Sequence, residues 1–306
     1  MEQKNITMHK VSSSRRFWRK TALQSHSLIF SFSHSLILSF SLFLIFSLPQ
    51  PVMAQCPVQN TAFQDGERLD YKLYFNWKFI WKTAGSATLT TKKSTYHGRP
   101  TFQSDLITRT SGRIDRWFCM RDTLRSIVSD DIIPLYYHKA SNEGGKYRFN
   151  RITYSYSGGQ TRTHQFYRSP KGNITEVDNQ VVGCAYDMLS MMLRARSYKS
   201  SQFAVGQRIP FHYVDNAKRK TETLIYRGIR QFTTEDENPV TYRCLVFSYV
   251  EKNEKGKEKD VVTFYITDDL NHIPVRLDLF LRFGIAKAYL VSATGLRNPQ
   301  TSIVKR

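Results

Sequence analysis

Alternation of side chains with a period of two is the sequence feature that most constrains the fold of this chain. Within Tyr71–Trp81, four aromatic residues occupy every second position: Phe75, Trp77, Phe79 and Trp81. Successive side chains of a β-strand point to opposite sides of a sheet, so this spacing predicts four rings on one face of a single strand. Segment 276–283 has leucines and a phenylalanine at its odd positions, with charged residues at most even ones. Such patterns are typical of an antiparallel sheet with one packed face.

Strand-like segments recur along most of the chain. Ten further segments are predicted as strands: 85–91, 101–108, 124–128, 135–140, 147–156, 161–167, 222–229, 241–250, 261–266 and 286–292. Turn sequences rich in Gly and Asn separate several of them, at 142–145, 157–159, 170–173 and 253–256. Gly and Asn tolerate the positive φ angles that tight hairpins need. Many short strands joined in this way predict a mainly β fold: a large antiparallel curved sheet or barrel, of one or two sheets.

One segment near the middle of the chain has helical spacing instead. In 185–197, apolar residues recur three and four positions apart, with Asp187 in the first turn and Arg194 and Arg196 in the last. These charges suit the dipole of a helix. We therefore expect one short amphipathic helix that fills or flanks the sheet, and its methionines favour core packing over a ligand site.

The first 54 residues resemble a targeting segment. Six basic residues and one acid precede an apolar stretch at 27–48. Pro49 and Pro51 follow the stretch, and Ala54 comes shortly after them. This layout is typical of a secretory signal peptide cleaved after Ala54, which implies an exported, periplasmic or envelope-associated protein. An uncleaved anchor and lipidation of Cys56 are the alternatives. We expect a single β-rich domain at 55–296 and a basic tail at 297–306.

The charge of the mature segment suggests a partner class. It holds 39 basic residues against 24 acidic ones, which leaves a net charge of +15 out of the +20 of the full chain. Basic proteins bind anionic surfaces, but an exported chain without a nucleic-acid motif is not expected to bind nucleic acid. No apolar run of the mature segment is long enough to predict a stable transmembrane segment. An envelope lipid or glycolipid is the partner that these observations favour, and a protein partner stays unknown.

The mature segment carries four cysteines, Cys56, Cys119, Cys184 and Cys244. Export permits disulfides, and four cysteines allow three complete pairings. None of them has the spacing of a zinc ribbon or a redox-active pair, so neither a metal nor another cofactor is expected. We expect one disulfide, with its partners left open.

Sequence motifs of known catalytic sites are missing, and one polar cluster is left as a catalytic candidate. It consists of Asp268, Asp269 and His272, two carboxylates and an imidazole within five residues. Such a set can serve as acid and base, but Asp and Asn before Pro274 also form turns, and the turn is the favoured interpretation. An enzyme is thus less expected than a binding protein.

Ligand-binding candidates come from the aromatic face and from two arginines. The four alternating rings can form a core or line a cavity for lipid tails or sugars. Arg121, with its neighbours Asp122, Arg113 and Arg116, and Arg276 could contact an anionic headgroup or pair with nearby acids. The core and internal pairing are favoured in both cases.

Six segments of the sequence resemble the DUF3108 family of exported bacterial proteins, and in particular its Bacteroidetes branch. They are Gly66–Tyr71, Ala84–Ala87, Met120–Leu124, Tyr186–Ser190, Phe264–Asp278 and Phe283–Tyr289. The resemblance extends from about Asn60 to Pro299. It implies an exported β-rich domain of unknown function, and it offers no established catalytic residues.

Three hypotheses for the function follow. The first is a non-enzymatic envelope protein that binds a lipid, glycolipid or other amphipathic ligand. The second is a hydrolase of envelope polymers that uses Asp268, Asp269 and His272. The third is a structural module of the cell envelope whose sheet edge pairs with another protein.

Overall fold

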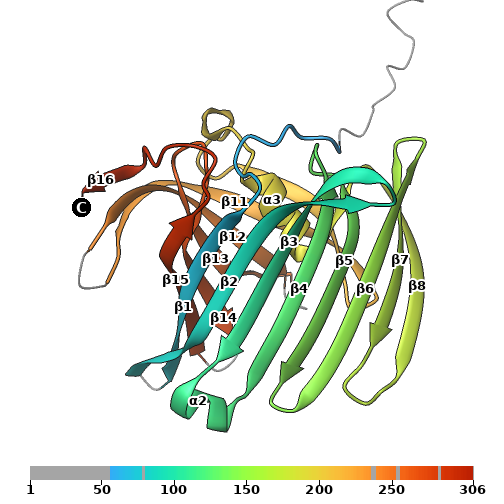
Figure 1. Ribbon diagram of the computed structural model, residues 1–306, viewed down its shortest axis with the longest axis horizontal. Helices are drawn as coiled ribbons and strands as arrows, with labels where there is room; N and C mark the ends of the chain where they lie inside the picture. Colours follow the sequence, from blue (N-terminus) through green and yellow to red (C-terminus); the bar gives the residue numbers. More distant parts are fainter. Residues whose placement is uncertain (1–55, 78–79, 236–238, 253–255, 282–283, 306) are drawn as a thin grey trace, which may run out of the picture. The chain divides into compact units, whose positions relative to one another are not determined.

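The chain folds as its period-two pattern predicts, into a protein built mainly of strands (Figure 1). The structure is a computed structural model that describes residues 56–77, 80–235, 239–252, 256–281 and 284–305. The predicted leader and its cleavage site lie outside the described residues.

Sixteen strands occur in the described ranges. They are β1 (Glu67–Trp77), β2 (Ile80–Tyr96), β3 (Arg99–Thr110), β4 (Met120–Ser129), β5 (Pro134–Glu143), β6 (Lys146–Ser157), β7 (Gln160–Arg168), β8 (Ile174–Val182), β9 (Ala185–Tyr186), β10 (Arg208–Asp215), β11 (Lys218–Thr233), β12 (Thr241–Lys252), β13 (Glu258–Thr267), β14 (Pro274–Leu281), β15 (Gly284–Thr294) and β16 (Ile303–Lys305). The same ranges contain the helices α2 (Gly112–Trp117) and α3 (Met188–Ala195) and a 3₁₀ turn, η1 (Ser200–Gln202).

All strands belong to one sheet, in the order β8-β7-β6-β5-β4-β3-β2-β1-β15-β14-β13-β12-β11-β10-β9, with β16 paired to β12. Neighbouring strands are antiparallel, except that β9 and β10 are parallel. This order confirms the predicted antiparallel curved sheet or barrel and shows that it is a single sheet.

The two edges of the sheet, β8 and β9–β10, are joined by a link of two residues and by side chains. Gly183 and Cys184 connect β8 to β9, so the chain crosses directly from one edge to the other. The amide of Asn150 on β6 donates to Asp215 on β10 at 2.8 Å, and Arg219 on β11 donates to the carbonyl of Gln180 on β8 at 3.0 Å. The sheet is therefore nearly closed into a barrel, with side chains bridging the seam.

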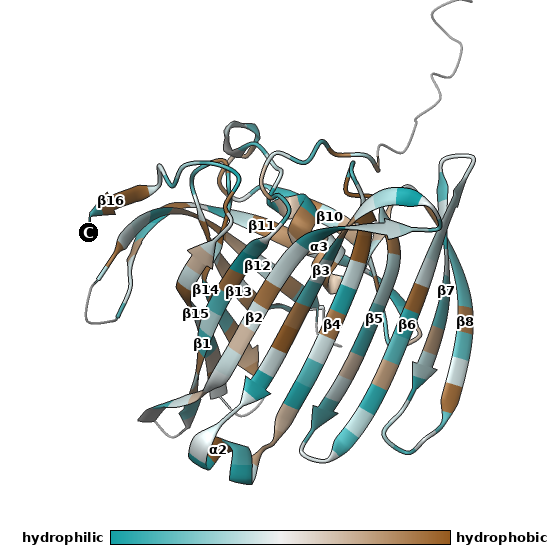
Figure 2. Ribbon diagram, viewed as in Figure 1, coloured by the Kyte–Doolittle hydropathy of each residue, from teal (hydrophilic) through white to brown (hydrophobic). Residues whose placement is uncertain are grey.

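The face of the sheet toward α3, here called the inner face, carries the core. Asp187, next to α3, bonds to Ser126 and Tyr154, which fixes the parity of this face. The large buried side chains at inner positions of β1, β2 and β4 to β6 include Leu69, Leu89, Leu124, Tyr137 and Ile152. Bands of apolar and polar residues alternate along these strands in Figure 2. The core thus forms from every second residue, as a half-buried sheet requires.

Two of the predicted turns form at glycine pairs. Gly144 and Gly145 connect β5 to β6 with φ angles of 57° and 77°, and Gly158 and Gly159 connect β6 to β7 with 57° and 73°. Positive φ at both central residues matches the twist of the strands in a two-residue hairpin. Glycine adopts this conformation without a Cβ clash, so the turn predictions are confirmed there.

The aromatic segment 71–81 is not the single strand that its alternation predicted. β1 ends at Trp77 and β2 begins at Ile80, so the segment contains a hairpin. In its register, Asn76 pairs with Trp81 and Phe75 with Lys82. Period-two alternation continues across a tight turn as well as along a strand, so the pattern alone does not locate the turn.

The helix and the end of the chain also differ from expectation. The predicted helix at 185–197 is shorter, because Ala185 and Tyr186 form β9 and Asp187 caps α3. The six-residue α2 is too short to give a periodic signal. The segment predicted as a basic tail packs onto the fold: β16 pairs with β12, and Ser302 is fully buried. Residues beyond 296 therefore belong to the domain.

Candidate functional site

The three residues of the candidate acid–base set lie in the turn between β13 and β14: Asp268, Asp269 and His272. Asp268 forms an ion pair with Arg243 at 2.7 Å. Asp269 accepts hydrogen bonds from the amide of Asn271 at 3.0 Å and from the hydroxyl of Ser302 at 2.7 Å. The carboxylates thus hold the turn and the end of the chain, which is the role that Asp has in turns.

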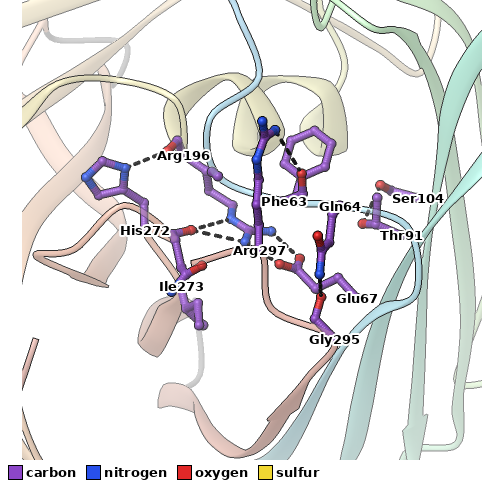
Figure 3. A network of polar contacts seen from close by, with 12 residues as sticks. Phe63, Gln64, Glu67, Thr91, Ser104, Arg196, His272, Ile273, Gly295 and Arg297 are labelled. Carbon is purple, nitrogen blue, oxygen red and sulfur yellow. Dashed lines mark hydrogen bonds and ion pairs between the residues drawn. The ribbon is translucent and has the colours of Figure 1, made fainter. Parts of the chain in front are cut away.

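His272 is buried and holds α3 in place (Figure 3). Its Nδ1 lies 2.5 Å from the carbonyl oxygen of Arg196, so Nδ1 carries the proton and donates it. Burial lowers the pKa of the His272 imidazole, which favours the neutral ring. The φ angle of 44° shows that its backbone also serves the turn.

Arg196 and Glu67 form a buried ion pair beneath this turn (Figure 3). Both side chains are 0% exposed, and two guanidinium nitrogens of Arg196 contact the two carboxylate oxygens of Glu67 at 2.6 and 2.8 Å. The same guanidinium donates to the carbonyl of Asn271 at 3.1 Å. Sequence reasoning missed this pair, because an arginine at the end of an amphipathic helix normally faces solvent.

The network extends to both ends of the described chain. Gln64 donates to the carbonyl of Gly295 at 3.2 Å, and Arg297 donates to that of Asn60 at 2.7 Å. Figure 3 shows the contact of Gln64 with Gly295 and a second contact of Arg297, to the carbonyl of Phe63. The ring of Phe63 lies 5.6 Å from the Arg196 guanidinium. We call Glu67, Arg196, Asn271, His272 and Arg297 the latch. Its arrangement joins the segment before β1 to the segment after β15.

Asp187 is a second buried charge, at the N-terminus of α3. Its carboxylate accepts from the amide of Ser190 at 2.9 Å, from the Tyr154 hydroxyl at 3.1 Å and from the Ser126 hydroxyl at 3.3 Å. Burial raises the pKa of Asp187 to about 6, against the opposing effect of these hydrogen bonds. Sequence reasoning placed Asp187 in the helix but not in the core.

The aromatic ligand candidates do not form the predicted stripe. Phe75 is on the inner face, opposite Ala286 of β15. Trp77 is the last residue of β1, and Trp81 is the second residue of β2. Phe79 lies outside the described residues. The hairpin therefore divides the three described positions between two strands.

The two candidate arginines are paired on the outer face. Arg121 contacts both carboxylate oxygens of Asp115 at 2.7 and 2.8 Å, and this pairing holds the pKa of Asp115 well below its usual range. Arg276 pairs with Asp278 at 2.7 Å and lies 4.7 Å from the ring centre of Tyr265. The structure therefore separates both arginines from the inner-facing Phe75.

The inner face of β4 to β7 is polar toward the end of the sheet that carries α2. By register, Asp122 of β4 lies opposite Ser141 of β5, and Lys139 lies opposite Asn150 of β6. Burial raises the pKa of Asp122 to about 6, and the nearby Glu143 adds to the shift. Lys139 lies 3.7 Å from Asp215, across the seam. We call Asp122, Ser141, Asn150, Thr163 and Gln165 the polar wall. Asp122 and Ser141 lie at the α2 end, whereas Thr163 lies opposite Tyr154, near α3.

Sequence reasoning did not find this wall. Both faces of β5 to β7 carry polar residues, so the period-two contrast that reveals an inner face is lost there.

The inner face of β1, β14 and β15 is apolar at the same end. Leu73 and Phe75 of β1 lie opposite Ala288 and Ala286 of β15, and Leu279 of β14 lies opposite Ala286. Leu73, Phe75, Leu279 and Ala286 are only half-buried. We call these four residues the apolar wall. The interior thus combines one apolar section of sheet with one polar section.

Two of the four cysteines are bonded. Cys56 and Cys184 form a disulfide that ties the segment before β1 to the link between β8 and β9. Cys119 is half-buried and Cys244 is buried, and both are free thiols. Burial raises the pKa of Cys244 to about 12, which keeps this thiol protonated and unreactive.

A groove of about 690 Å³ lies over β10 to β12. Most of the charges along it are paired with one another: Arg208 with Glu258, and Lys220 with both Glu222 and Glu251. Within the described ranges, no three His, Cys, Asp or Glu residues are grouped to hold a metal ion. No helix in this part of the chain has the length and apolar character to cross a membrane.

Comparisons with known proteins agree with the resemblance seen in the sequence. A β-barrel-like protein of the DUF1849 family from Brucella abortus aligns at 9% identity and a TM-score of 0.49, over 76% of this chain and 98% of its own. A protein assigned as exported, with a YmcC-like fold, from Bacteroides fragilis aligns at 8% identity and a TM-score of 0.30, over 78% and 99%. The curated proteins gave no match. The model of the DUF3108 family, described as a protein of unknown function, matches residues 70–291, and the chain belongs to this family.

Proposed function

We propose that the mature chain is a non-enzymatic protein of the cell envelope that binds a lipid or glycolipid on the inner face of its sheet. The carrying observation is the division of the inner face into an apolar wall and a polar wall, which begins with Asp122 and Ser141 at the α2 end. An amphipathic molecule has the same two parts. The leader and the basic charge of the mature segment support an envelope location, periplasmic after cleavage at Ala54.

The apolar wall supports binding of an acyl chain. Leu73, Phe75 and Leu279 are large apolar side chains on the inner face that stay half-buried, although other inner positions of the same strands, such as Leu69, are fully buried. Covering exposed apolar surface contributes about 25 cal/mol per Å², so a hydrocarbon chain against these residues would be stabilised. Ala286 and Ala288 keep this section of the inner face free of bulky side chains.

The catalytic alternative lacks comparable support. Asp268, Asp269 and His272 are engaged by Arg243, Ser302 and the carbonyl of Arg196. A general acid or base needs a free position toward its substrate. The proposal therefore assigns these residues to the turn and the latch.

Blocking the apolar wall tests the proposal. Native mass spectrometry of the mature protein purified from the periplasm, followed by denaturing extraction, should reveal a co-purifying lipid or glycolipid. Ala286→Trp places an indole between Phe75 and Leu279, and we expect it to reduce the bound fraction at least tenfold. The matched control is Val291→Trp on the same strand, where the side chain is 65% exposed, and it should leave the bound fraction unchanged.

Two results would contradict this function. One is a homogeneous, empty mass for the wild-type protein together with no uptake of added lipid. The other is an equal lipid content in the two tryptophan variants, provided that circular dichroism shows both to be folded.

A further inference from the structure

The polar wall contains buried polar atoms that have no hydrogen-bond partner among the described residues. They are Asp122 Oδ1, Ser141 Oγ, Asn150 Oδ1, Thr163 Oγ1 and Gln165 Oε1. Their residues are between 0% and 9% exposed. Native proteins pair nearly all buried polar groups, because an unpaired group loses its bonds to water without replacement. Five such atoms in one region need an explanation.

These atoms lie on a diagonal across four strands, and a further unpaired atom, Asn179 Nδ2 of β8, belongs to the residue opposite Thr163. Thr163 and Gln165 are two residues apart on β7, and Gln165 lies opposite Ile152, two residues from Asn150 on β6. Asn150 in turn lies opposite Lys139, two residues from Ser141, which faces Asp122. Residues two apart on a strand and those opposite on the next strand share a face. All five side chains therefore belong to the inner face.

The chemistry of the patch selects a class of partner. Three of the atoms are carbonyl or carboxylate oxygens, which only accept, and the other two are hydroxyl oxygens, which accept or donate. The nearby cations are already paired, Lys139 with Asp215 and Arg148 with Glu143. A phosphate offers acceptors only, so it would meet repulsion at three of the five positions. A group rich in hydroxyls can donate to the acceptors that it reaches and can donate to, or accept from, the two hydroxyls.

We infer that the polar wall binds an uncharged, hydroxyl-rich group, a sugar or polyol. This inference rests on the proposed function and names the headgroup of its ligand: a glycolipid rather than a phospholipid with an anionic head. The net positive charge of the chain would suggest the opposite choice, but three of these unpaired atoms only accept, and one, Asn179 Nδ2, only donates.

Lipids that share one tail and differ in headgroup test this inference. The mature chain is titrated with dioleoylglycerol carrying glucose, with dioleoyl phosphatidic acid and with dioleoylglycerol alone, each in detergent micelles. We expect the glucosyl lipid to bind at least tenfold more tightly than phosphatidic acid. Competition by free glucose would assign the same chemistry to a soluble glycan. Equal or tighter binding of phosphatidic acid would overturn the inference and leave the proposed function intact, whereas no binding of any lipid would overturn the proposed function itself.

Variants of the wall separate recognition from folding. The double variant Thr163→Val, Gln165→Met removes two unpaired oxygen atoms while it keeps side-chain volume. It also removes the long hydrogen bond from Gln165 to the carbonyl of Lys218, so we expect the two effects to offset each other and the free protein to stay folded. The preference for glucose should fall to below threefold, with binding of dioleoylglycerol retained. Thr153→Val, on the outer face of β6, is the control and should keep the preference. A folded double variant that also keeps it would overturn the inference.

Discussion

Asp187 is a buried carboxylate whose hydrogen-bond partners are neutral, and this determines how it responds to pH. Hydroxyls of Ser126 and Tyr154 and the amide of Ser190 contact it. Such bonds favour the charged form, but burial disfavours it more strongly, and the pKa rises from 3.8 to about 6. The folded protein therefore retains a proton at pH values where the unfolded chain has released it.

This retained proton predicts a loss of stability as the pH rises. Because the folded state binds more protons between pH 4 and 6, the free energy of unfolding falls with increasing pH in that range. The contribution is complete below pH 3.8 and lost as the pH passes 6. A shift of about two pH units corresponds to about 3 kcal/mol. Urea unfolding from pH 4 to 7 should show that the free energy of unfolding of the wild type falls by about this amount relative to that of Asp187→Asn.

Other carboxylates do not obscure the comparison. Asp122 also has a pKa of about 6, but it is present in both proteins, so its effect cancels in the difference. Asparagine at position 187 still accepts from the helix amides, which keeps the cap. Parallel stability curves for the two proteins would show that Asp187 does not titrate in this range.

Arg196 and Glu67 show where prediction from the sequence ends at the level of a residue. The turn at 268–273 could be predicted, because Asp, Asn and Pro favour turns locally. The pair buried beneath it could not, because Glu67 and Arg196 lie 129 residues apart and are brought together only by closure of the sheet. A buried pair of this kind stabilises only through its geometry, which the sequence does not encode locally.

At the level of elements, the hairpins with glycine pairs were predictable and the aromatic hairpin was not. A glycine pair in the sequence predicts a turn, because glycine adopts positive φ angles more easily than other residues do. This holds at Gly144–Gly145 and at Gly158–Gly159. Aromatic residues with a high strand propensity lie on both sides of the turn between β1 and β2. Strand propensity therefore does not indicate where β1 ends and β2 begins. The polar wall could not be predicted from the sequence either, because its strands carry polar residues on both faces and the period-two contrast is lost.

The disulfide Cys56–Cys184 should be the strongest single restraint on the segment before β1. It closes a loop with a sequence separation of 128, and loop-closure entropy of that size corresponds to about 4 to 5 kcal/mol of stability. The double variant Cys56→Ser, Cys184→Ser should lose this amount in urea unfolding under oxidising conditions. Cys119→Ser, which removes a free thiol, should change little. A loss of less than about 1 kcal/mol in the double variant would show that the noncovalent contacts of this segment hold it without the disulfide.

At the scale of the whole domain, the seam is the part of the barrel that backbone hydrogen bonds do not hold. Asp215 of β10 makes two contacts with strands beyond the opposite edge: it accepts from Asn150 of β6 at 2.8 Å and lies 3.7 Å from Lys139 of β5. Gln165 adds a bond to the carbonyl of Lys218 at 3.4 Å. Two of the residues that bridge the seam, Asn150 and Gln165, also belong to the polar wall. Opening of the seam would therefore expose the proposed headgroup site from the side.

Loss of Asp215 should loosen the seam without unfolding the domain. Asp215→Ala leaves Lys139 and Asn150 without their partner, so we expect amide hydrogen exchange in β8 and β10 to accelerate at least tenfold, with β1 to β4 unchanged. The control is Asp105→Ala, which removes a similarly buried carboxylate whose partner, Arg125, lies within the continuous part of the sheet. Lipid uptake should accelerate with exchange in Asp215→Ala, because both require the same opening. Faster exchange with an unchanged uptake rate would show that the ligand enters through an end of the barrel instead.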